Sequence, residues 1–119
     1  MKDTIKTLED ACKALNIEFK PVEGLTKDEL AYQKLKIIAK ALNEGWEPNW
    51  NNWDEWKYYP WFRMGDRDGS PGVGFSCSGY GYVSGASSVG SRLCFKTREL
   101  AEYAGKQFIE LYKEYMLIG

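Results

Sequence analysis

Apolar side chains recur at intervals of three and four residues in three stretches of the chain. Because an α-helix completes a turn about every 3.6 residues, this spacing gathers the apolar side chains on one face and predicts an amphipathic helix in each stretch. The positions expected to face the core are Ile5, Leu8, Cys12 and Leu15 in the first stretch, Ala31, Leu35, Ile38 and Leu42 in the second, and Leu100, Ala104, Phe108, Leu111 and Tyr115 in the third.

Capping residues mark the ends of these expected helices. Thr26 followed three residues later by Glu29 is typical of a capping box, in which each residue satisfies a free backbone amide of the other. Gly45 fits a left-handed stop after the second helix. Asn16 is expected to end the first helix, and Thr97 is expected to cap the last one.

Between the second and third helices the periodicity changes to the two-residue alternation of half-buried strands. Residues 56–64 and 73–77 are expected strands, and Pro60 is expected to place a bulge or an edge in the first of them. Leu93 and Phe95 alternate with polar neighbours and predict a third strand. The order helix–helix–strand–strand–strand–helix predicts an α+β fold, with three helices outside a small antiparallel sheet of about three strands.

Composition agrees with one globular domain. The chain has 119 residues, 44% hydrophobic and 28% charged, with a formal net charge of −1. This balance is typical of a domain with one core, so residues 1–119 are expected to form a single domain. No run approaches the roughly 20 apolar residues that a membrane-spanning helix needs. Residues 1–16 contain no continuous apolar run either, so the sequence predicts a cytoplasmic protein without membrane contact.

Histidine is absent from the chain. Its absence excludes Ser-His-Asp and Cys-His catalysis within this chain and removes the commonest metal ligand. Cys12, Cys77 and Cys94 are far apart and form no CxxC pair, so they are expected to be reduced thiols that hold no metal. No catalytic pair and no phosphate-binding motif stands out, so the sequence predicts a non-enzymatic protein without cofactor or metal.

All five tryptophans lie within residues 46–62, which we call the aromatic segment. Large aromatic side chains dominate both cores and interfaces, so two interpretations are open. In the first, the helices are packed onto the sheet by Trp46, Trp50, Trp56, Trp61 and Phe62. In the second, some rings are exposed as an interface, and Trp50 and Trp53 are favoured because asparagines flank them. Trp61 and Phe62 are consecutive in an expected strand, so one should meet the core and the other a second layer or solvent.

Residues 78–91 contain only Gly, Ser, Tyr, Val and Ala. They are expected to form a polar loop, or a loose hairpin around Tyr80 and Tyr82, with the composition of adaptable binding loops. The candidate binding residues of the whole chain are Trp50, Trp53, Tyr58, Trp61, Tyr80 and Tyr82.

Exposed rings of this kind serve a protein partner as interface anchors, which is the favoured interpretation. They also stack with the bases of single-stranded nucleic acid, which is the alternative. The basic residues near the aromatic segment are sparse and have carboxylates among them. Carboxylates repel phosphate, so this composition disfavours the nucleic-acid alternative.

Three phrases of the sequence carry a resemblance: ALNEGWEPNW at 41–50, KYYPWF at 57–62 and GSRLCFKTRELAEYAGKQF at 90–108. They resemble an uncharacterised family of small proteins and terminal domains from phages and prophages of gut Bacteroides-type bacteria, over roughly residues 25–117. The resemblance implies a phage or mobile-element setting and brings no activity or site residues. The sequence thus predicts a non-enzymatic module of such origin, binding a protein partner through the aromatic segment and the 78–91 loop.

Overall fold

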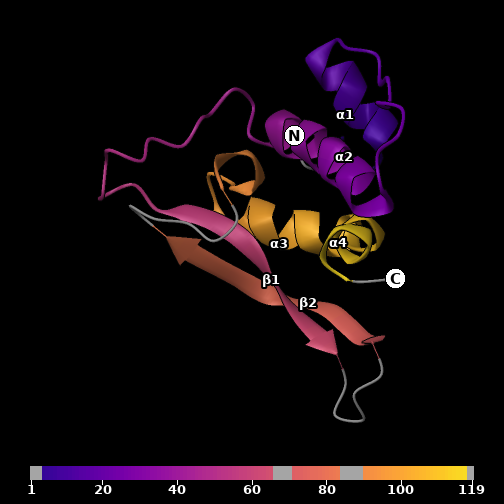
Figure 1. Cartoon of the computed structure of the whole chain (residues 1–119). Helices are drawn as coiled ribbons and strands as arrows, with labels where there is room; N and C mark the ends of the chain where they lie inside the picture. Colours follow the sequence, from indigo (N-terminus) through magenta and orange to yellow (C-terminus); the bar gives the residue numbers. More distant parts are fainter. Residues whose placement is uncertain (1–3, 66–70, 84–89, 118–119) are drawn as a thin grey trace.

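The computed structural model describes residues 4–65, 71–83 and 90–117, as three layers (Figure 1). The first layer is α1 (Leu8–Leu15) and α2 (Lys27–Leu42), and the second is α3 (Arg98–Gln107) and α4 (Ile109–Met116). The third is an antiparallel hairpin of β1 (Lys57–Gly65) and β2 (Pro71–Val83). A short 3-10 helix, η1 (Ser91–Leu93), precedes α3. Helix α1 packs on α2, α2 packs on α4, and α3 covers one face of the hairpin. The mixed α+β class is therefore confirmed.

Helix α1 ends at Asn16 and helix α2 begins after Thr26, as their capping residues predict, but α2 ends two residues before the expected stop at Gly45. At α2, Glu29 Oε1 accepts a hydrogen bond from the Thr26 backbone N–H at 3.0 Å, which confirms the capping box. Asn16 ends α1 in the left-handed region, with φ of 55°. Gly45 is also left-handed, with φ of 88°, although the C-cap itself is Asn43 in the right-handed region. All four expected core positions of α2 are buried.

The predicted last helix is two helices, because the backbone breaks at Phe108 with φ of −111° and ψ of 31°. The break changes which face of the chain meets the core. Leu100, Ala104 and Phe108 are buried as predicted, but the next buried side chain is Tyr112. The expected core residues Leu111 and Tyr115 are only half-buried. The prediction assumed one uninterrupted helix, and the break at Phe108 turns these two side chains away from the core.

Within the residues that the structure describes, the sheet has two strands, so the prediction of three strands is not confirmed. Residues 94–96 lie beside β1 through one isolated bridge, in which Tyr58 and Phe95 exchange backbone hydrogen bonds of 3.0 and 2.7 Å. The 3-10 turn η1 replaces the start of that third strand. Strand β2 is longer than expected: its end covers residues 78–83, six of the fourteen residues of the predicted loop. The register shifts between Trp61 and Phe62, close to Pro60, but the residue without a partner is Ser78, so this bulge lies in β2 and not in the first strand as expected.

One buried amide joins the helices to the chain beside the sheet. The Asn43 side chain is buried, its Nδ2 donates to the Cys94 carbonyl at 2.9 Å, and its Oδ1 accepts from the Lys96 N–H at 3.1 Å. At the other end of the core, Tyr112 of α4 packs on Phe62 of β1 with ring centroids 4.9 Å apart. The Tyr112 contact holds the hairpin against the second layer, and among the described residues the helices that pack on the hairpin lie on one of its faces.

Candidate functional site

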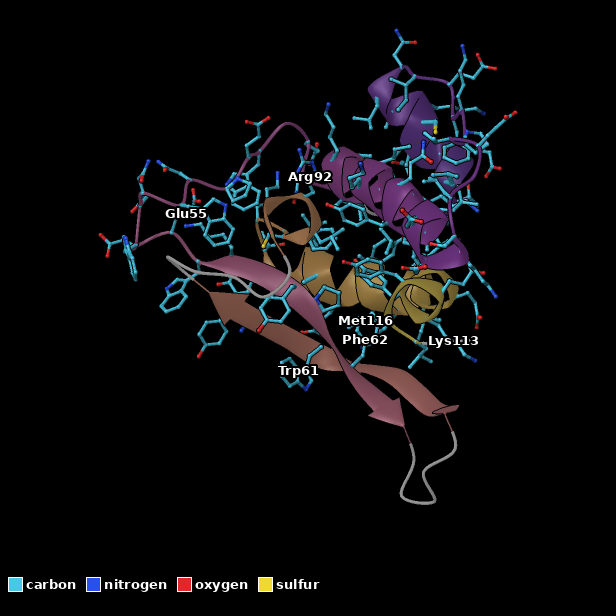
Figure 2. The ribbon with its side chains drawn as sticks, in the orientation of Figure 1. Glu55, Trp61, Phe62, Arg92, Lys113 and Met116 are labelled. Carbon is cyan, nitrogen blue, oxygen red and sulfur yellow. The ribbon has the colours of Figure 1, made fainter. Side chains whose placement is uncertain are left out.

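The two faces of β1 have different partners. Pro60 and Phe62 are buried toward α3 and α4, whereas Trp61 is 56% exposed. Figure 2 shows Trp61 projecting from the hairpin on the side opposite the helices, while Phe62 points toward them. The prediction that these two consecutive side chains face opposite sides is therefore confirmed. The reason is the alternation of side chains along a strand.

A first aromatic group forms where the hairpin joins the preceding loop. The rings of Trp56 and Tyr82 meet edge to face, with centroids 4.9 Å apart and planes at 89°. Tyr58, directly opposite Tyr82 in the strand register, lies 6.3 Å from it. Trp56 is 49% exposed and Tyr82 is 56% exposed, so the group presents ring surface to solvent.

A second aromatic group, Tyr59 and Trp61, lies on β1 with ring centroids 6.3 Å apart. Tyr59 is opposite Gly81 in the register, and its ring lies over that glycine. A β-carbon at Gly81 would come within 2.6 Å of the Tyr59 hydroxyl oxygen. The glycine therefore gives the ring space to lie flat across the neighbouring strand, which is how an aromatic side chain protects a glycine within a sheet.

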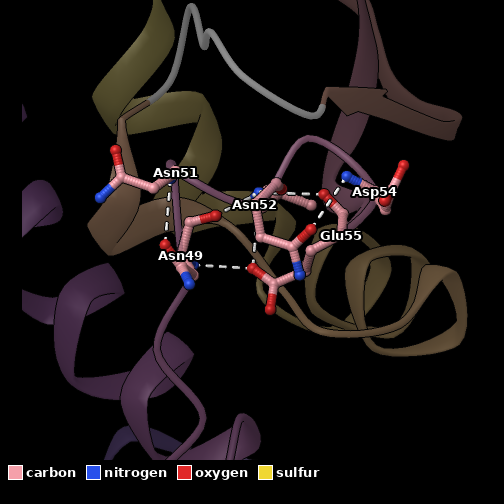
Figure 3. Close-up of polar contacts among 6 residues, drawn as sticks. Asn49, Asn51, Asn52, Asp54 and Glu55 are labelled. Atoms are coloured by element: carbon pink, nitrogen blue, oxygen red, sulfur yellow. Dashed lines mark hydrogen bonds and ion pairs between the residues drawn. The ribbon is translucent and has the colours of Figure 1, made fainter.

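The loop before β1 is organised by its own side chains (Figure 3). Asn49 Oδ1 accepts from the Asn51 N–H at 3.0 Å, and Asn52 Oδ1 accepts from the Asp54 N–H at 3.1 Å. Both are turns closed by a side-chain amide oxygen. Glu55 Oε1 accepts from the Asn49 N–H at 2.7 Å and joins the two ends of the loop. Trp53, between these turns, is 68% exposed, more than any other large hydrophobic side chain described.

Lys57 holds this loop together from inside. Its side chain is fully buried, and its Nζ donates to the carbonyls of Asn49, Asn52 and Glu55 at 2.7, 3.0 and 2.9 Å. These three bonds match the three donors of an ammonium group. The Glu55 carboxylate lies 3.4 Å from the same nitrogen, and the Trp50 ring lies 5.1 Å from it. The loop backbone and the Glu55 carboxylate therefore surround the Lys57 ammonium group.

The loop that carries the exposed ring of Trp53 is acidic. Residues 46–56 contain three carboxylates and no lysine or arginine. The nearest cation in sequence, Lys57, is buried and paired, so it offers no charge to a ligand. A surface of this kind attracts cationic or neutral groups and repels phosphate.

The predicted binding residues have different outcomes. Trp53, Trp61 and Tyr82 are exposed, whereas Tyr58 is half-buried against the core and Trp50 is half-buried beside Lys57. The side chain of Tyr80 lies outside the described part of the structure, as do residues 84–89 of the predicted loop.

The interpretation of the aromatic segment as core is wrong for most of its rings. Of the five side chains expected to pack the helices onto the sheet, only Phe62 is buried. Trp46 and Trp50 are half-buried, and Trp56 and Trp61 are exposed. Sequence reasoning missed Trp56 as an exposed ring and Lys57 as the centre of the loop. The available signal was that Lys57 is the first cation after three carboxylates and three turn-forming asparagines.

A separate cavity of about 360 Å³ lies at the other end of the molecule. Its walls are Val22, Leu25, Asp28, Glu29, Tyr32, Gln33, Lys36 and Tyr115. Tyr32 and Tyr115 stack inside it with centroids 5.5 Å apart. Burial raises the pKa of the Tyr115 phenol above its ordinary value, and Tyr32 and Asp28 raise that pKa further. The Lys36 ammonium already covers the Tyr32 ring, at 5.0 Å from its centroid.

Among residues 4–65, 71–83 and 90–117, no group of three or more Cys, Asp or Glu side chains is placed to hold a metal ion. Cys12 and Cys94 are buried free thiols, as expected. No helix in the described chain is long and apolar enough to cross a membrane. Comparison with protein-family models, with curated proteins and with solved structures finds no match.

Proposed function

We propose that this chain is a non-enzymatic interaction module that binds a protein partner through the exposed aromatic rings of the hairpin and its loop. The observation that supports this most is the exposure of Trp53, Trp56, Trp61 and Tyr82 on the hairpin and the loop that precedes it. Monomeric proteins rarely expose such rings together, and tryptophan and tyrosine are the residues most enriched among interface hot spots.

The hydrogen bonds that fix the conformation of the loop also support this proposal. Lys57 and Glu55 hold Trp53 on a loop whose conformation is set before a partner arrives. Such preorganisation lowers the entropic cost of binding, because the ligand does not have to order the loop. A loop that served only as a connection would have no need of a buried ammonium group at its centre.

The charge of the surface favours a protein over a nucleic acid. Single-stranded nucleic acid would stack on these rings, but its phosphates would meet Asp54 and Glu47 with no free cation on the loop. A protein partner with neutral or cationic side chains meets no such repulsion. We infer a phage or mobile-element setting from the resemblance carried by the three phrases of the sequence. We propose a cytoplasmic location because reduced thiols, such as Cys12 and Cys94, are typical of that compartment.

The test is a capture of partners from lysate of a phage-carrying bacterial host, followed by affinity measurements with the purified partner. Trp53→Ala and Trp61→Ala remove one ring from the loop and one from the outer face of β1. Ile17→Ala, which removes an exposed apolar side chain in the segment after α1, is the control. We expect the tryptophan variants to weaken binding by about 2 kcal/mol or more, as for interface hot spots.

Stability and oligonucleotide measurements make the test decisive. Trp53→Ala should cost less than about 1 kcal/mol of unfolding free energy, because its side chain is exposed. If Trp53→Ala unfolds the domain instead, the segment is part of the core and the proposal is wrong. If a thymidine oligonucleotide binds with an affinity that falls steeply with salt, and Trp53→Ala abolishes that binding, the module binds nucleic acid instead.

A further inference from the structure

The cavity between α2 and α4 combines aromatic rings with an excess of negative charge. Its volume of about 360 Å³ lies within the range of sites for small organic ligands. Tyr32 of α2 and Tyr115 of α4 stack in its wall with ring centroids 5.5 Å apart. Figure 1 shows these two helices side by side. Val22 and Leu25 add apolar surface from the segment before α2, and Val22 is exposed, so the cavity is open to solvent.

The charged groups in the walls of this cavity do not balance. They are the carboxylates of Asp28 and Glu29 and the ammonium group of Lys36, so one negative charge remains. Asp28 Oδ1 and Glu29 Oε1 both approach the Thr26 hydroxyl, at 2.6 and 2.7 Å. A hydroxyl has one proton, so it can satisfy only one of these carboxylates at a time. A single positive charge in the cavity would balance the walls and relieve the repulsion between the two carboxylates.

The Lys36 side chain shows that a cation can lie on these rings. Its ammonium nitrogen is 5.0 Å from the centroid of the Tyr32 ring, which is within the range of a cation–π contact. The charge of Asp28 also acts on the stacked rings. Burial, then Tyr32 and then Asp28 raise the pKa of the Tyr115 phenol above its ordinary value. A cation beside the stacked rings therefore meets both a ring face and the field of a carboxylate.

We propose that this cavity binds a small organic cation of the quaternary ammonium class against the Tyr32–Tyr115 stack, with Asp28 as its counter-ion. Such a cation has no N–H group, so ring faces and a carboxylate suffice to bind it. An anionic ligand would be repelled by Asp28 and Glu29. A calcium ion would need roughly six to eight oxygen ligands, and no group of three Cys, Asp or Glu in the part of the chain that the structure describes is placed to hold one. This site is independent of the proposed protein-binding function.

The first measurement is a titration of the natural chain with choline, followed by NMR at constant ionic strength. We expect saturation with a Kd of about 1 mM or tighter, and shifts of the Asp28, Tyr32 and Tyr115 resonances. The control ligand is the neutral analogue dimethylbutanol, in which a carbon atom replaces the charged nitrogen of choline. It should bind at least about tenfold more weakly, because it has no cation–π attraction. Equal affinities for the two ligands, or no binding of choline up to about 10 mM, would overturn the proposal.

The same titration locates the bound cation. The hairpin has exposed rings of its own, including Trp61 and Tyr82, and exposed rings also attract cations. Shifts that are largest at Tyr32 and Tyr115 support the cavity as the site. If the resonances of Trp61 and Tyr82 move and those of Tyr32 and Tyr115 stay in place, choline binds the hairpin and the proposal is wrong.

Two variants that change the charge of the cavity in opposite directions complete the test. Asp28→Asn removes the counter-ion and should weaken choline binding at least about threefold. Lys36→Met removes the ammonium group that competes for the Tyr32 ring, so it should tighten binding at least about threefold. Glu18→Gln, which removes an exposed carboxylate outside the cavity walls, is the control and should leave the Kd unchanged. A damaged fold would not bind choline more tightly. If Lys36→Met weakens binding or leaves it unchanged, the cation does not lie on the Tyr32 ring and the proposal is wrong.

Discussion

The Lys57 ammonium group lies inside the loop and satisfies three backbone carbonyl groups that converge on it. A lysine is seldom fully buried, because removing its charge from water is costly unless hydrogen bonds and an opposite charge offset the cost. Here both are present, since Glu55 completes the ion pair at 3.4 Å. One residue thus determines whether the loop that carries Trp53 keeps its shape.

Lys57→Met should lower the unfolding free energy by about 2 to 4 kcal/mol, because the carbonyls and Glu55 lose a buried partner. The comparison is Lys96→Met, which removes the lysine of the half-exposed Lys96–Glu44 pair at 3.6 Å. That variant should cost less than about 1 kcal/mol. Urea unfolding of both variants provides the measurement. Equal costs for the two variants would show that the loop does not depend on the buried ammonium group.

Among the elements, α1 and α2 each have a carboxylate that accepts backbone hydrogen bonds at the start of the helix. Asp10 Oδ2 accepts from the N–H groups of Lys6 and Thr7, at 3.0 and 3.2 Å, and these bonds lower the pKa of its carboxyl. The Thr26 hydroxyl and N–H donate to Glu29 Oε1, at 2.7 and 3.0 Å, and lower the pKa of that carboxyl in the same way. Both groups are therefore bound more strongly as carboxylates than as acids, and each stabilises the fold when it is ionised.

The sign of the pH dependence follows from these lowered pKa values. The contribution of both carboxylates is complete above their ordinary values of 3.8 and 4.5, and it is lost as the pH falls through the lower values of the folded chain. Asp10→Asn with Glu29→Gln should therefore reduce the loss of urea resistance between pH 7 and pH 2. Glu110→Gln, in the first turn of α4, should leave that loss unchanged. If the double variant loses as much urea resistance at low pH as the natural chain does, the acid sensitivity does not come from Asp10 and Glu29.

The hairpin depends on a contact between a ring and a glycine. Gly81→Ala would displace the Tyr59 ring from β2 and should cost about 1 kcal/mol, the scale of a cross-strand pair. The ring is the far end of a side chain that can move aside, so a larger loss is not expected. In a Tyr59→Ala background, Gly81→Ala should be close to neutral. A double-mutant cycle measured by thermal unfolding tests this, and additive effects would show that the contact contributes nothing.

At the scale of the whole molecule, one buried amide joins the end of α2 to the chain beside the hairpin. Asn43, which follows the last residue of α2, bonds the Cys94 carbonyl and the Lys96 N–H through its side-chain amide. These bonds join the end of α2 to the segment before α3. Because Phe95 lies between these two residues, the Asn43 amide also positions Phe95, which pairs with Tyr58 at the start of the hairpin. The loop and its rings are therefore held in place through a chain of contacts that begins at a helix end.

Asn43→Ala should lower the unfolding free energy by about 2 to 3 kcal/mol, because it leaves a buried carbonyl and a part-buried N–H without their partner. Asn51→Ala removes an exposed asparagine of the loop and should cost less than about 0.5 kcal/mol. Chemical unfolding of the two variants is the measurement. A small loss for Asn43→Ala would mean that water replaces the amide and that packing alone joins the layers.

The sequence by itself determined the features that depend on neighbouring residues. The starts of α1, α2 and α3 follow from capping side chains, and the opposite orientations of Trp61 and Phe62 follow from strand geometry. The mixed α+β class could be predicted from the change of periodicity along the chain. In each case the responsible hydrogen bonds or side-chain directions span only a few residues, so their signal is readable in the local pattern.

Tertiary structure alone decided the features that depend on distant contacts. The break at Phe108 brings Tyr112 onto Phe62, and residues 94–96 form one bridge where a strand was expected, with Asn43 as their clamp. Which tryptophans are exposed was likewise decided by the limited surface that α3 and α4 offer the hairpin. Burial depends on which elements pack together, and the local sequence pattern does not show which distant residues will come into contact.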